Sequence, residues 1–463
     1  MFNLDDAPII ARASGTQTAA LAVVRISGIK DLAAWVAYFT ANILTLTPRQ
    51  QTLTKIQNPA TKQILDQGLI TFFPAPHSYT GENILEITVH GNSHQVQSMM
   101  DMWVQQGLAR YAQAGEFTRR AIKNKKMTIA QAEGLDLFFQ ARSSAVAAQG
   151  LSLLFGGLYE QYWRLRQAFI DWTAAFNLFF DFLEDVGAVQ AQATWHQASE
   201  NLGDLCQSLS AQCQHSWESF VYPTVLLLGP PNAGKSSLFN ALLNTPRAIV
   251  HEQAGTTRDY LAEDFTFEHT IYKLIDTAGI WAGNAAVEQE GIKRSLAWKA
   301  KAFYKVLVLD ASLAHQTEFL AYLAGESFNL LVFTHLDQAT SPDAAKTALL
   351  TLLKQSQISF AEQISLDLKN HAAQAQSIWP KVAQAYAKLQ ALNPVAIERH
   401  RQLILEIAPA VQKIIEQFDQ GQRDLTVLEM QIKVVGQKIE ELVGIVDAQE
   451  IINHVLANFC IGK

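Results

Sequence analysis

The sequence predicts a multidomain α+β protein in which a mixed N-terminal domain precedes a helical domain, and an α/β domain is inserted into the helical one. The chain has 463 residues, enough for about three domains of ordinary size. Residues 219–376 combine buried-strand patterns with a glycine-rich loop, whereas the stretches 119–218 and 377–463 on either side have helical character. We therefore expect one helical domain built from both flanking segments, which the neighbouring chain ends of an α/β insertion allow.

Composition excludes several classes of protein. Apolar residues make up 49% of the chain, which excludes wholesale disorder, and the net charge of −7 confines any RNA contact to a local basic patch. No run approaches the roughly 18 apolar residues of a membrane span, and the acidic start Met1–Asp6 predicts no signal peptide. The cysteines, Cys206, Cys213 and Cys460, are too few for a disulfide scaffold and lack a zinc pattern, so we expect a cytoplasmic protein.

Residues 1–118 alternate between strand and loop character and predict the mixed N-terminal domain. Ala20–Ile26 and Ile84–Val89 are short β-rich runs, and Pro74–Gly81 between them has turn chemistry. The next segment, Arg119–Lys126, has five basic residues in eight. Such a run is typical of a solvated helix face, but it also suits a contact to an RNA backbone.

The second helical segment contains a regular apolar stripe. In residues 424–446 the apolar side chains recur at steps of three and four, which predicts one buried face along a helix. The stripe consists of Leu425, Leu428, Ile432, Val435, Ile439, Leu442 and Val446.

A phosphate-binding loop opens the inserted domain. The strand pattern Thr224–Leu228 runs into Gly229-Pro-Pro-Asn-Ala-Gly-Lys-Ser236, and a helix pattern begins at Ser237. This is G-x-x-x-x-G-K-S in the strand–loop–helix context that the motif requires, with loop N–H groups and a helix N-terminus facing the phosphates. We expect Lys235 to reach the β- and γ-phosphates and the Ser236 hydroxyl to be placed for Mg²⁺.

Two further elements follow in the order of a nucleotide-hydrolysing switch domain. Tyr272–Gly279 is a strand that ends in Asp276, which can hold Mg²⁺ through water, and the Gly279 N–H can meet the γ-phosphate. Between the two motifs, Gly255–Asp259 is switch-like, because a threonine there can complete the Mg²⁺ shell only while the γ-phosphate is present. Ile280 cannot orient water as glutamine does in many small GTPases, so another polar group must do so.

The sequence favours guanine as the base. The usual guanine motif is Asn-Lys-x-Asp after a strand, and here the strand pattern ends in Thr334-His335-Leu336-Asp337. The two carboxylate oxygens of Asp337 suit the paired N–H donors of guanine and repel the acceptor edge of adenine. Thr334 and His335 replace the usual asparagine and lysine, and Ser365 lies where a further loop touches the base in such domains.

Together these residues resemble, along essentially the whole chain, the bacterial tRNA-modification GTPases of the MnmE (TrmE) type. The C-terminal Phe459–Lys463, which ends in Cys-Ile-Gly-Lys, is the most specific mark, because other GTPases with this G domain lack it. The remaining marks occur in the family's order: Pro76–Glu82, His90-Gly91, Gly115–Thr118, Ala130–Glu133, Asp181-Phe182, Gly229–Ser237 and Gly255–Asp259.

The resemblance implies an N-terminal domain (1–118) that binds folate and dimerises, a helical domain (119–218 and 377–463) and an inserted Ras-like P-loop GTPase domain (219–376). It implies GTP hydrolysis that K⁺ and dimerisation of the G domain stimulate. With a flavin-containing partner of the MnmG (GidA) type, such proteins add an aminomethyl-type group (5-carboxymethylaminomethyl) at C5 of wobble uridine 34 in certain tRNAs. The one-carbon unit comes from 5-formyl- or 5,10-methylene-tetrahydrofolate.

The resemblance also assigns roles to individual residues. Glu288 would orient the water, Lys235 would stabilise the phosphates, and Cys460 would be a catalytic thiol or a small packed residue. The contacts to GTP would be Asn232, Ala233, Gly234, Lys235, Ser236, Ser237, His251, Gly255, Thr256, Thr257, Asp276, Thr277, Ala278, Gly279, Thr334, His335, Asp337 and Ser365. Ser236 and Thr257 would hold Mg²⁺; Asn232, His251, Gln253 and Thr256 would hold K⁺; Arg25, Glu86, Lys126 and Lys463 would bind folate.

Two alternatives remain open from the sequence. A GTPase of ribosome or RNA assembly would share the G domain only, and the N-terminal marks and the Cys-Ile-Gly-Lys end count against it. A GTP-binding scaffold with inefficient turnover would explain Thr334-His335 and the bulky His251–Gln253, where the family has smaller residues around the K⁺ site.

Overall fold

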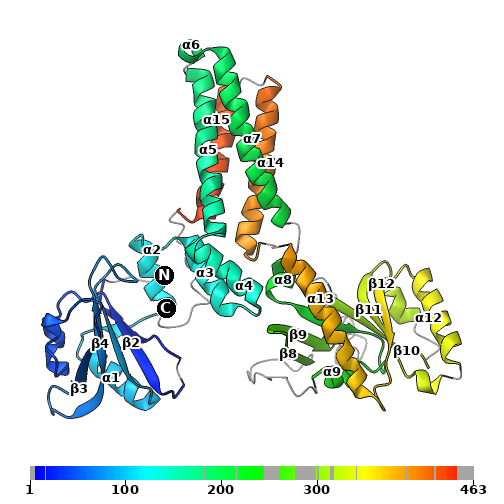
Figure 1. Cartoon of the computed structure of the whole chain (residues 1–463), viewed down its shortest axis with the longest axis horizontal. Coiled ribbons are helices and arrows are strands. Elements are labelled where there is room, and N and C mark those ends of the chain that lie inside the picture. Colours follow the sequence, from blue (N-terminus) through cyan, green and yellow to red (C-terminus); the bar gives the residue numbers. More distant parts are fainter. Residues whose placement is uncertain are drawn as a thin grey trace. The chain divides into compact units, whose positions relative to one another are not determined.

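The chain is described from a computed structural model (Figure 1). The residues that the structure describes are 6–15, 17–181, 183–213, 217–243, 261–276, 299, 302–312, 317–339, 341–392, 395–421 and 424–445. They fall into two compact units, Met1–Asp136 with Gly150–Ile170 and Lys433–Lys463, and Leu137–Gln149 with Asp171–Ile432. Among the described helices, none combines the length and the apolar composition that a membrane crossing requires.

The N-terminal residues form a six-stranded sheet of order β3-β4-β5-β2-β1-β6, antiparallel except for the pairing of β1 with β6. The strands are β1 Ile9–Arg12, β2 Leu21–Ser27, β3 Thr52–Gln57, β4 Ile64–Phe73, β5 Ile84–His90 and β6 Arg110–Tyr111. The two predicted β-rich runs are thus confirmed as β2 and β5. The helix α1 Ser93–Gln105 and the 3-10 turns η1 Ala33–Tyr38 and η2 Ile43–Thr45 pack buried side chains, among them Trp103 and Trp35, into the same core as this sheet.

The predicted helical stretches are helical. The first contains α2 Glu116–Lys123, α3 Ile129–Gln140, α4 Ser144–Phe155, α5 Leu158–Asp181, α6 Leu183–Val186, α7 Ala188–Gln212 and α8 Trp217–Val221. The second contains α13 Ile378–Ala391, α14 Glu398–Asp419 and α15 Leu425–Val443. The described positions of the apolar stripe in α15, from Leu428 to Leu442, are at most 5% exposed, which confirms the predicted buried face.

Helices from the two stretches pack against each other. On α7, the Trp195 ring lies with its centroid 4.2 Å from that of Phe418 on α14, and its Nε1 donates to Asp419 at 3.2 Å. Trp172 of α5 also stacks on Trp195, with a centroid distance of 5.3 Å. These contacts confirm one helical assembly built from both sides of the inserted domain.

The inserted domain is an α/β domain of the predicted Ras-like class. Its sheet has the order β12-β11-β10-β7-β9-β8, and every pairing is parallel except that of β8 with β9. The strands are β7 Thr224–Leu228, β8 Leu261–Phe267, β9 Thr270–Asp276, β10 Tyr304–Asp310, β11 Ser327–Thr334 and β12 Ser359–Ser365. Because β12, β11, β10, β7 and β9 all run in the same direction, their carboxyl ends meet at the edge where the phosphate loop begins.

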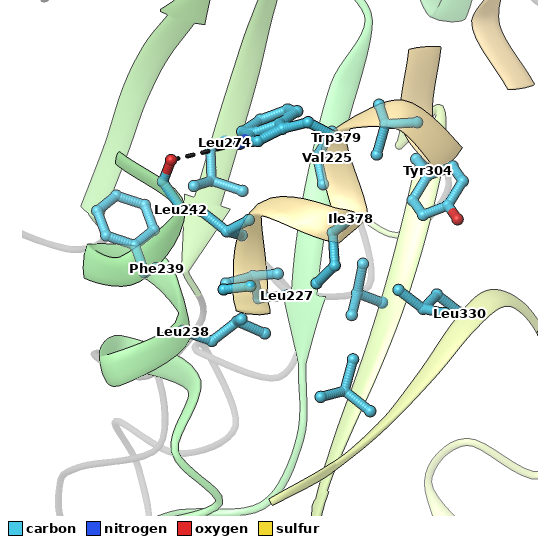
Figure 2. Close-up of a cluster of buried hydrophobic side chains, with 14 of the residues drawn as sticks. Val225, Leu227, Leu238, Phe239, Leu242, Leu274, Tyr304, Leu330, Ile378 and Trp379 are labelled. Atoms are coloured by element: carbon cyan, nitrogen blue, oxygen red, sulfur yellow. Dashed lines mark hydrogen bonds between the residues drawn. The ribbon is translucent and has the colours of Figure 1, made fainter. Parts of the chain in front are cut away.

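Alternate residues of these strands point to opposite faces of the sheet, and each face has its own core. Val225 and Leu227 of β7 pack with α9 Lys235–Leu243, the 3-10 helix η5 Ala372–Ser377 and α13, as Figure 2 shows. Leu226 and Leu228 pack on the other face with α11 Thr317–Ala321 and α12 Pro342–Gln355. The continuous apolar run of β7 follows from burial on both faces.

The first turn of α13 belongs to the core of the nucleotide-binding sheet. The Trp379 ring stacks on Phe265 of β8 with a centroid distance of 4.2 Å and an interplanar angle of 12°. Its Nε1 donates to Leu242 O at 3.3 Å (Figure 2). Tyr386, about two helical turns further along α13, donates to Phe220 O at 2.6 Å. The predicted division at residue 376 thus falls two residues before a helix whose side chains fill this core, and the boundary stays a prediction.

The corner between α3 and α4 holds the hairpin of β8 and β9. The backbone carbonyl oxygen of Arg142 accepts a hydrogen bond from Ile271 N at 2.8 Å, and the Arg142 guanidinium pairs with Asp264 at 2.9 Å. The neighbouring Ser143 bonds the hydroxyl of Tyr386 at 3.0 Å. A segment of the helical stretch therefore bonds both strands of the hairpin, which lie in the sequence between the phosphate loop and the end of β9 at Asp276.

We predict that Trp379→Ala destabilises the inserted domain by about 3–5 kcal/mol, because it removes a 1% exposed indole and leaves a cavity against Phe265. Calorimetric unfolding measures this as a lowered transition of that domain. Tyr322→Ala is the control, since Tyr322 is 58% exposed and its removal should change stability by less than about 0.5 kcal/mol. An unchanged transition in Trp379→Ala would show that α13 does not stabilise this core.

Candidate functional site

The phosphate loop follows β7 at the carboxyl edge of the second sheet. A β-carbon at Gly229 would lie 2.2 Å from Val308 O, so only glycine lets the chain leave β7 beside β10. Asn232 and Gly234 have φ angles of +63° and +84°, and α9 then begins at Lys235. This left-handed turn into a helix N-terminus is the local structure that turns successive N–H groups towards an anion.

Three polar side chains of the motif are gathered under the loop. Lys235 is 3% exposed and its ammonium donates to Pro230 O at 2.7 Å, while the Ser236 hydroxyl donates to Asp276 at 2.8 Å. Burial lowers the pKa of Lys235, and the negative charge of Asp276 acts against that shift. The hydroxyl and the carboxylate are adjacent oxygen donors of the kind that Mg²⁺ prefers, so these residues fit the predicted ion.

The predicted base-binding residues lie at the ends of β11 and β12. Thr334 is 1% exposed, and its hydroxyl donates to Ala233 O of the phosphate loop at 2.8 Å. His335 has the left-handed φ of +52° and starts the 3-10 turn η4 Leu336–Gln338, which contains the exposed Asp337. Ser365 pairs with Phe333 across the sheet and is exposed at the same edge. The fold therefore brings the predicted base-binding segments to one edge of the sheet, where Thr334 contacts the phosphate loop.

Several predicted residues lie outside the part of the chain that the structure describes. They are His251, Gln253, Gly255, Thr256 and Thr257 of the switch-like loop, Thr277, Ala278 and Gly279 after β9, the predicted catalytic Glu288, and Cys460 and Lys463 near the chain end. The remaining members of the predicted nucleotide site, Asn232 to Ser237, lie on the described loop and the first turn of α9.

The predicted folate residues Arg25 and Glu86 are cross-strand partners in the first sheet. They face each other in the register of β2 and β5, and Arg25 Nε donates to Glu86 at 2.8 Å. The guanidinium also lies over two rings, 5.4 Å from the centroid of Tyr79 and 5.8 Å from that of Phe117. Both charged side chains remain about a quarter exposed, 22% and 27%, so they form an accessible ion pair against an aromatic wall.

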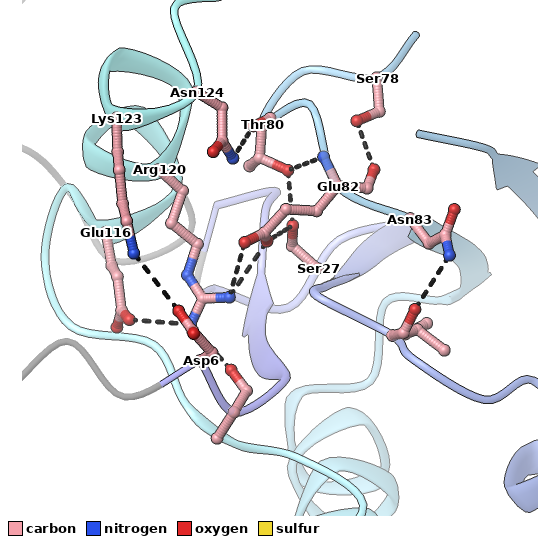
Figure 3. Close-up of polar contacts among 12 residues, drawn as sticks. Asp6, Ser27, Ser78, Thr80, Glu82, Asn83, Glu116, Arg120, Lys123 and Asn124 are labelled. Carbon is pink, nitrogen blue, oxygen red and sulfur yellow. Dashed lines mark hydrogen bonds and ion pairs between the residues drawn. The ribbon is translucent and has the colours of Figure 1, made fainter. Parts of the chain in front are cut away.

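The loop that carries Tyr79 is tied to the rest of the N-terminal domain by polar contacts (Figure 3). Ser27 bonds the Thr80 hydroxyl at 2.7 Å and donates to Glu82 at 2.8 Å. Arg120 of α2 donates to Glu82 at 3.0 and 3.3 Å, and Asn124 donates to Thr80 O at 2.7 Å. The Thr80 hydroxyl and the Glu82 carboxylate of the Pro76–Glu82 segment therefore hold this loop against β2 and α2.

Lys126, the third predicted folate residue, is exposed and lies against the same loop. Its Cγ and Cε are both 3.2 Å from the position that a β-carbon at Gly81 would occupy. The loop thus places Tyr79 over Arg25 and Gly81 beside Lys126. The sequence analysis did not single out Tyr79 and Phe117, whose rings lie beside Arg25. Both residues belong to the family marks Pro76–Glu82 and Gly115–Thr118, which could have pointed to them.

The side chains of the basic run Arg119–Lys126 are divided between the interior and the surface of the domain. Arg119 and Arg120 are 6% and 4% exposed, whereas Lys123, Lys125 and Lys126 are exposed. Arg120 bonds Glu82, Glu116 and Ala7 O, so its charge is compensated inside the domain. Burial raises the pKa of Glu116, but the hydrogen bond and charge of Arg110 outweigh it and hold that pKa below its usual value. Only the lysines of this run are available for the predicted ligand contacts.

We predict that Glu82→Ala destabilises the N-terminal domain by about 2–3 kcal/mol, because the buried Arg120 loses a charged partner while it keeps Glu116 and Ala7 O. The control is Lys123→Ala, whose partner Asp6 lies 3.3 Å away at a surface where the two side chains are 57% and 78% exposed. That exposed pair should contribute at most about 1 kcal/mol. Equal effects of the two substitutions on thermal unfolding would contradict a structural role for Glu82.

Comparison with known proteins identifies relatives along the whole chain. Residues 8–126 match the family profile described as the N-terminus of the GTP-binding protein TrmE, and residues 224–335 match the profile described as a 50S ribosome-binding GTPase. A protein of Granulibacter bethesdensis named tRNA modification GTPase MnmE is 32% identical, over 98% of this chain and 99% of that protein. Proteins of the same name from Alkaliphilus oremlandii and Agrobacterium fabrum are each 30% identical. The first alignment covers 99% of both chains, and the second covers 98% of both.

Among solved structures, the G domain of the Thermotoga maritima FeoB iron transporter aligns with 35% of this chain and 98% of its own. Its sequence identity is 25% and its TM-score 0.25.

Proposed function

Since the chain belongs to the MnmE family of tRNA modification GTPases, we propose that it acts with a flavin-containing partner of the MnmG type on wobble uridine 34 of certain tRNAs. The product is an aminomethyl-type group, 5-carboxymethylaminomethyl, at C5 of that uridine. A tetrahydrofolate derivative, 5-formyl or 5,10-methylene, donates the one-carbon unit. The observation that carries the proposal is the presence in one chain of the TrmE-type N-terminal match at 8–126 and the GTPase match at 224–335.

The side chains around the phosphate loop support the proposed hydrolysis of GTP. Lys235 heads α9 beneath the loop and supplies positive charge, while Ser236 and Asp276 offer two oxygens at 2.8 Å from each other. Mg²⁺, when bound there, neutralises charge on the β- and γ-phosphates. By the resemblance, Glu288 orients the attacking water, a role that Ile280 in the preceding segment cannot fill. The resemblance also assigns Thr257 to the Mg²⁺ shell and the Gly279 N–H to the γ-phosphate.

We propose that K⁺ supplies the second positive charge at the phosphates. Asn232 lies at the turn of the phosphate loop with an exposed side chain, and its carbonyl oxygen is a donor suited to a monovalent cation. Backbone or side-chain oxygens of His251, Gln253 and Thr256 would close the shell. Such closure also offers a surface to a second G domain, so K⁺ and homodimerisation are coupled in this proposal.

In the N-terminal domain, the proposed folate site has charged side chains that complement the charged and polar groups of a folate. Arg25 and Lys126 offer cations to the glutamate carboxylates of a folate, and Glu86 offers acceptors to a pterin donor edge. The Tyr79 and Phe117 rings beside Arg25 provide an apolar wall for a planar ring. In this proposal the domain also dimerises, Lys463 reaches the folate, and Cys460 is either a thiol or a packed residue. The protein acts in the cytoplasm on tRNA.

Deletion of the protein should abolish 5-carboxymethylaminomethyl-type nucleosides at uridine 34, as mass spectrometry of digested tRNA would measure. The wild-type chain should restore them, and Lys235→Ala should not, because it removes the buried cation at the phosphate loop. Normal wobble nucleosides in the deletion strain would overturn the proposal. Accumulation of incomplete ribosomal particles with normal tRNA would instead favour the ribosome-assembly alternative.

GTP hydrolysis should increase with K⁺ and decrease when Na⁺ replaces K⁺ at equal ionic strength. Asn232→Ala should lose that dependence, whereas the control Asn240→Ala, an exposed amide further along α9, should keep it. The expected difference between K⁺ and Na⁺ in the wild type is about tenfold or more, since a positioned charge at the developing negative charge is worth several kcal/mol. Equal rates in the two salts at every concentration would favour the scaffold alternative.

A further inference from the structure

The helix α2 ends in a turn that two backbone hydrogen bonds define. Lys126 N donates to Ala121 O at 2.8 Å, and Lys125 N donates to Ile122 O at 3.0 Å. This pair of bonds is the Schellman arrangement, whose left-handed residue is usually glycine or asparagine. Lys125 has that left-handed conformation here, with a φ of +56°. Because the backbone favours glycine at this position, the turn itself does not require a lysine side chain there.

The turn borders the loop of the proposed folate site. Asn124 Nδ2 donates to Thr80 O at 2.7 Å, which ties the end of α2 to that loop (Figure 3). The Cγ and Cε of Lys126 both lie 3.2 Å from the position that a β-carbon at Gly81 would occupy. Gly81 is two residues from Tyr79, an aromatic residue of the proposed site, and two residues of chain span at most about 7 Å. A ligand held at the aromatic wall can therefore extend to the lysines of the turn.

Three exposed lysines give this turn an excess of positive charge. Lys123, Lys125 and Lys126 lie within four consecutive positions, and all three side chains are exposed. Within the described ion pairs of the N-terminal domain, the acid that these lysines contact is Asp6, 3.3 Å from the Lys123 ammonium (Figure 3). The carboxylates nearer the interior are paired with the buried Arg120, so they do not neutralise the lysines. The surface of the turn thus suits a ligand that carries several negative charges.

We propose that the turn is a subsite for the poly-γ-glutamate tail of a folate. Lys126 contacts the first glutamate, and Lys125 and Lys123 contact carboxylates further along the tail. Each γ-linked glutamate adds one carboxylate, and an ammonium group on a flexible four-carbon stem pairs with a carboxylate without a fixed geometry. The inference rests on the proposed binding of folate and adds the class of substrate, a folate with several glutamates instead of one.

The number and the place of the lysines favour a short chain of carboxylates over a nucleic acid. Proteins that bind nucleic acid through its backbone make about 6–10 phosphate contacts. The turn offers three lysines, and one of them already contacts Asp6. It also adjoins the loop of the proposed folate site, and the glutamate end of a folate carries its carboxylates out of such a site. Two or three added carboxylates match the charge of this surface.

Direct titration of the full-length chain with 5-formyltetrahydrofolate that carries one, three or five glutamates tests the subsite. The wild type should bind the triglutamate about tenfold more tightly than the monoglutamate, because two added carboxylates each gain an exposed ion pair. That advantage should decrease as the ionic strength rises. Lys125→Gly should reduce it to about threefold and leave the affinity for the monoglutamate unchanged.

The same variant separates a binding role from a structural one. Glycine adopts the left-handed conformation without strain, so Lys125→Gly should keep or raise the unfolding temperature while it weakens binding of the tail. The matched control is Lys62→Gly, since Lys62 is also exposed and left-handed, with a φ of +60°, in the turn between β3 and β4. It should keep the tenfold advantage of the triglutamate. If Lys125→Gly does not fold, Lys125→Asn replaces it, because asparagine is also common at this position of the turn.

Three results would overturn the proposal. Equal affinities of the wild type for one, three and five glutamates would show that nothing binds the tail, while binding of the monoglutamate would leave the proposed folate site intact. An undiminished advantage of the triglutamate in Lys125→Gly would place the tail elsewhere. A loss of tRNA binding in Lys125→Gly with unchanged dependence on tail length would assign the lysines to RNA. If no folate bound at all, both the subsite and the proposed folate site would be wrong.

Discussion

The parallel alignment of β7 with β9 and β10, and of β10 with β11, is the constraint on which the nucleotide site depends. It brings the carboxyl ends of these strands to one edge, so that the phosphate loop, Asp276 and Thr334 meet there although they come from three separate segments. Burial of both faces of the sheet stabilises that alignment, because alternate residues of each strand contribute to one of two apolar cores. The position of the site residues thus depends on the two apolar cores that cover the faces of the sheet.

Covering one face requires residues from beyond the inserted domain's own predicted limits. Trp379 and Tyr386 of α13 fill the core above β8 and β9, and the α3–α4 corner pairs Arg142 with Asp264 on the same hairpin. The hairpin lies between the two motifs whose loops sense the γ-phosphate in this class of domain. Helical-domain residues therefore contribute directly to the stability of the strands that support nucleotide binding.

The N-terminal domain uses polar contacts where the inserted domain uses apolar ones. The loop before β5 has few large apolar side chains, and its position depends on Ser27, Thr80, Glu82 and Arg120. Because Arg120 is almost fully buried, its charge requires several partners at once, which restricts the loop to one arrangement. That arrangement sets Tyr79 against Arg25 and so gives the candidate folate site its aromatic wall.

The sequence by itself determined the three kinds of segment, the strands β2, β5 and β7, the buried stripe of α15 and the identity of the phosphate loop, because periodicity and turn chemistry are local properties. It also identified a GTPase of the family to which the chain belongs, whereas the role of Asp337 as the base reader stays a prediction. Only the tertiary structure decided that Thr334 bonds Ala233, that Arg25 faces Glu86, that Arg120 is buried and that α13 joins the nucleotide-binding core. These pairings join residues far apart in the chain, and strand register and packing, which no local pattern encodes, select them.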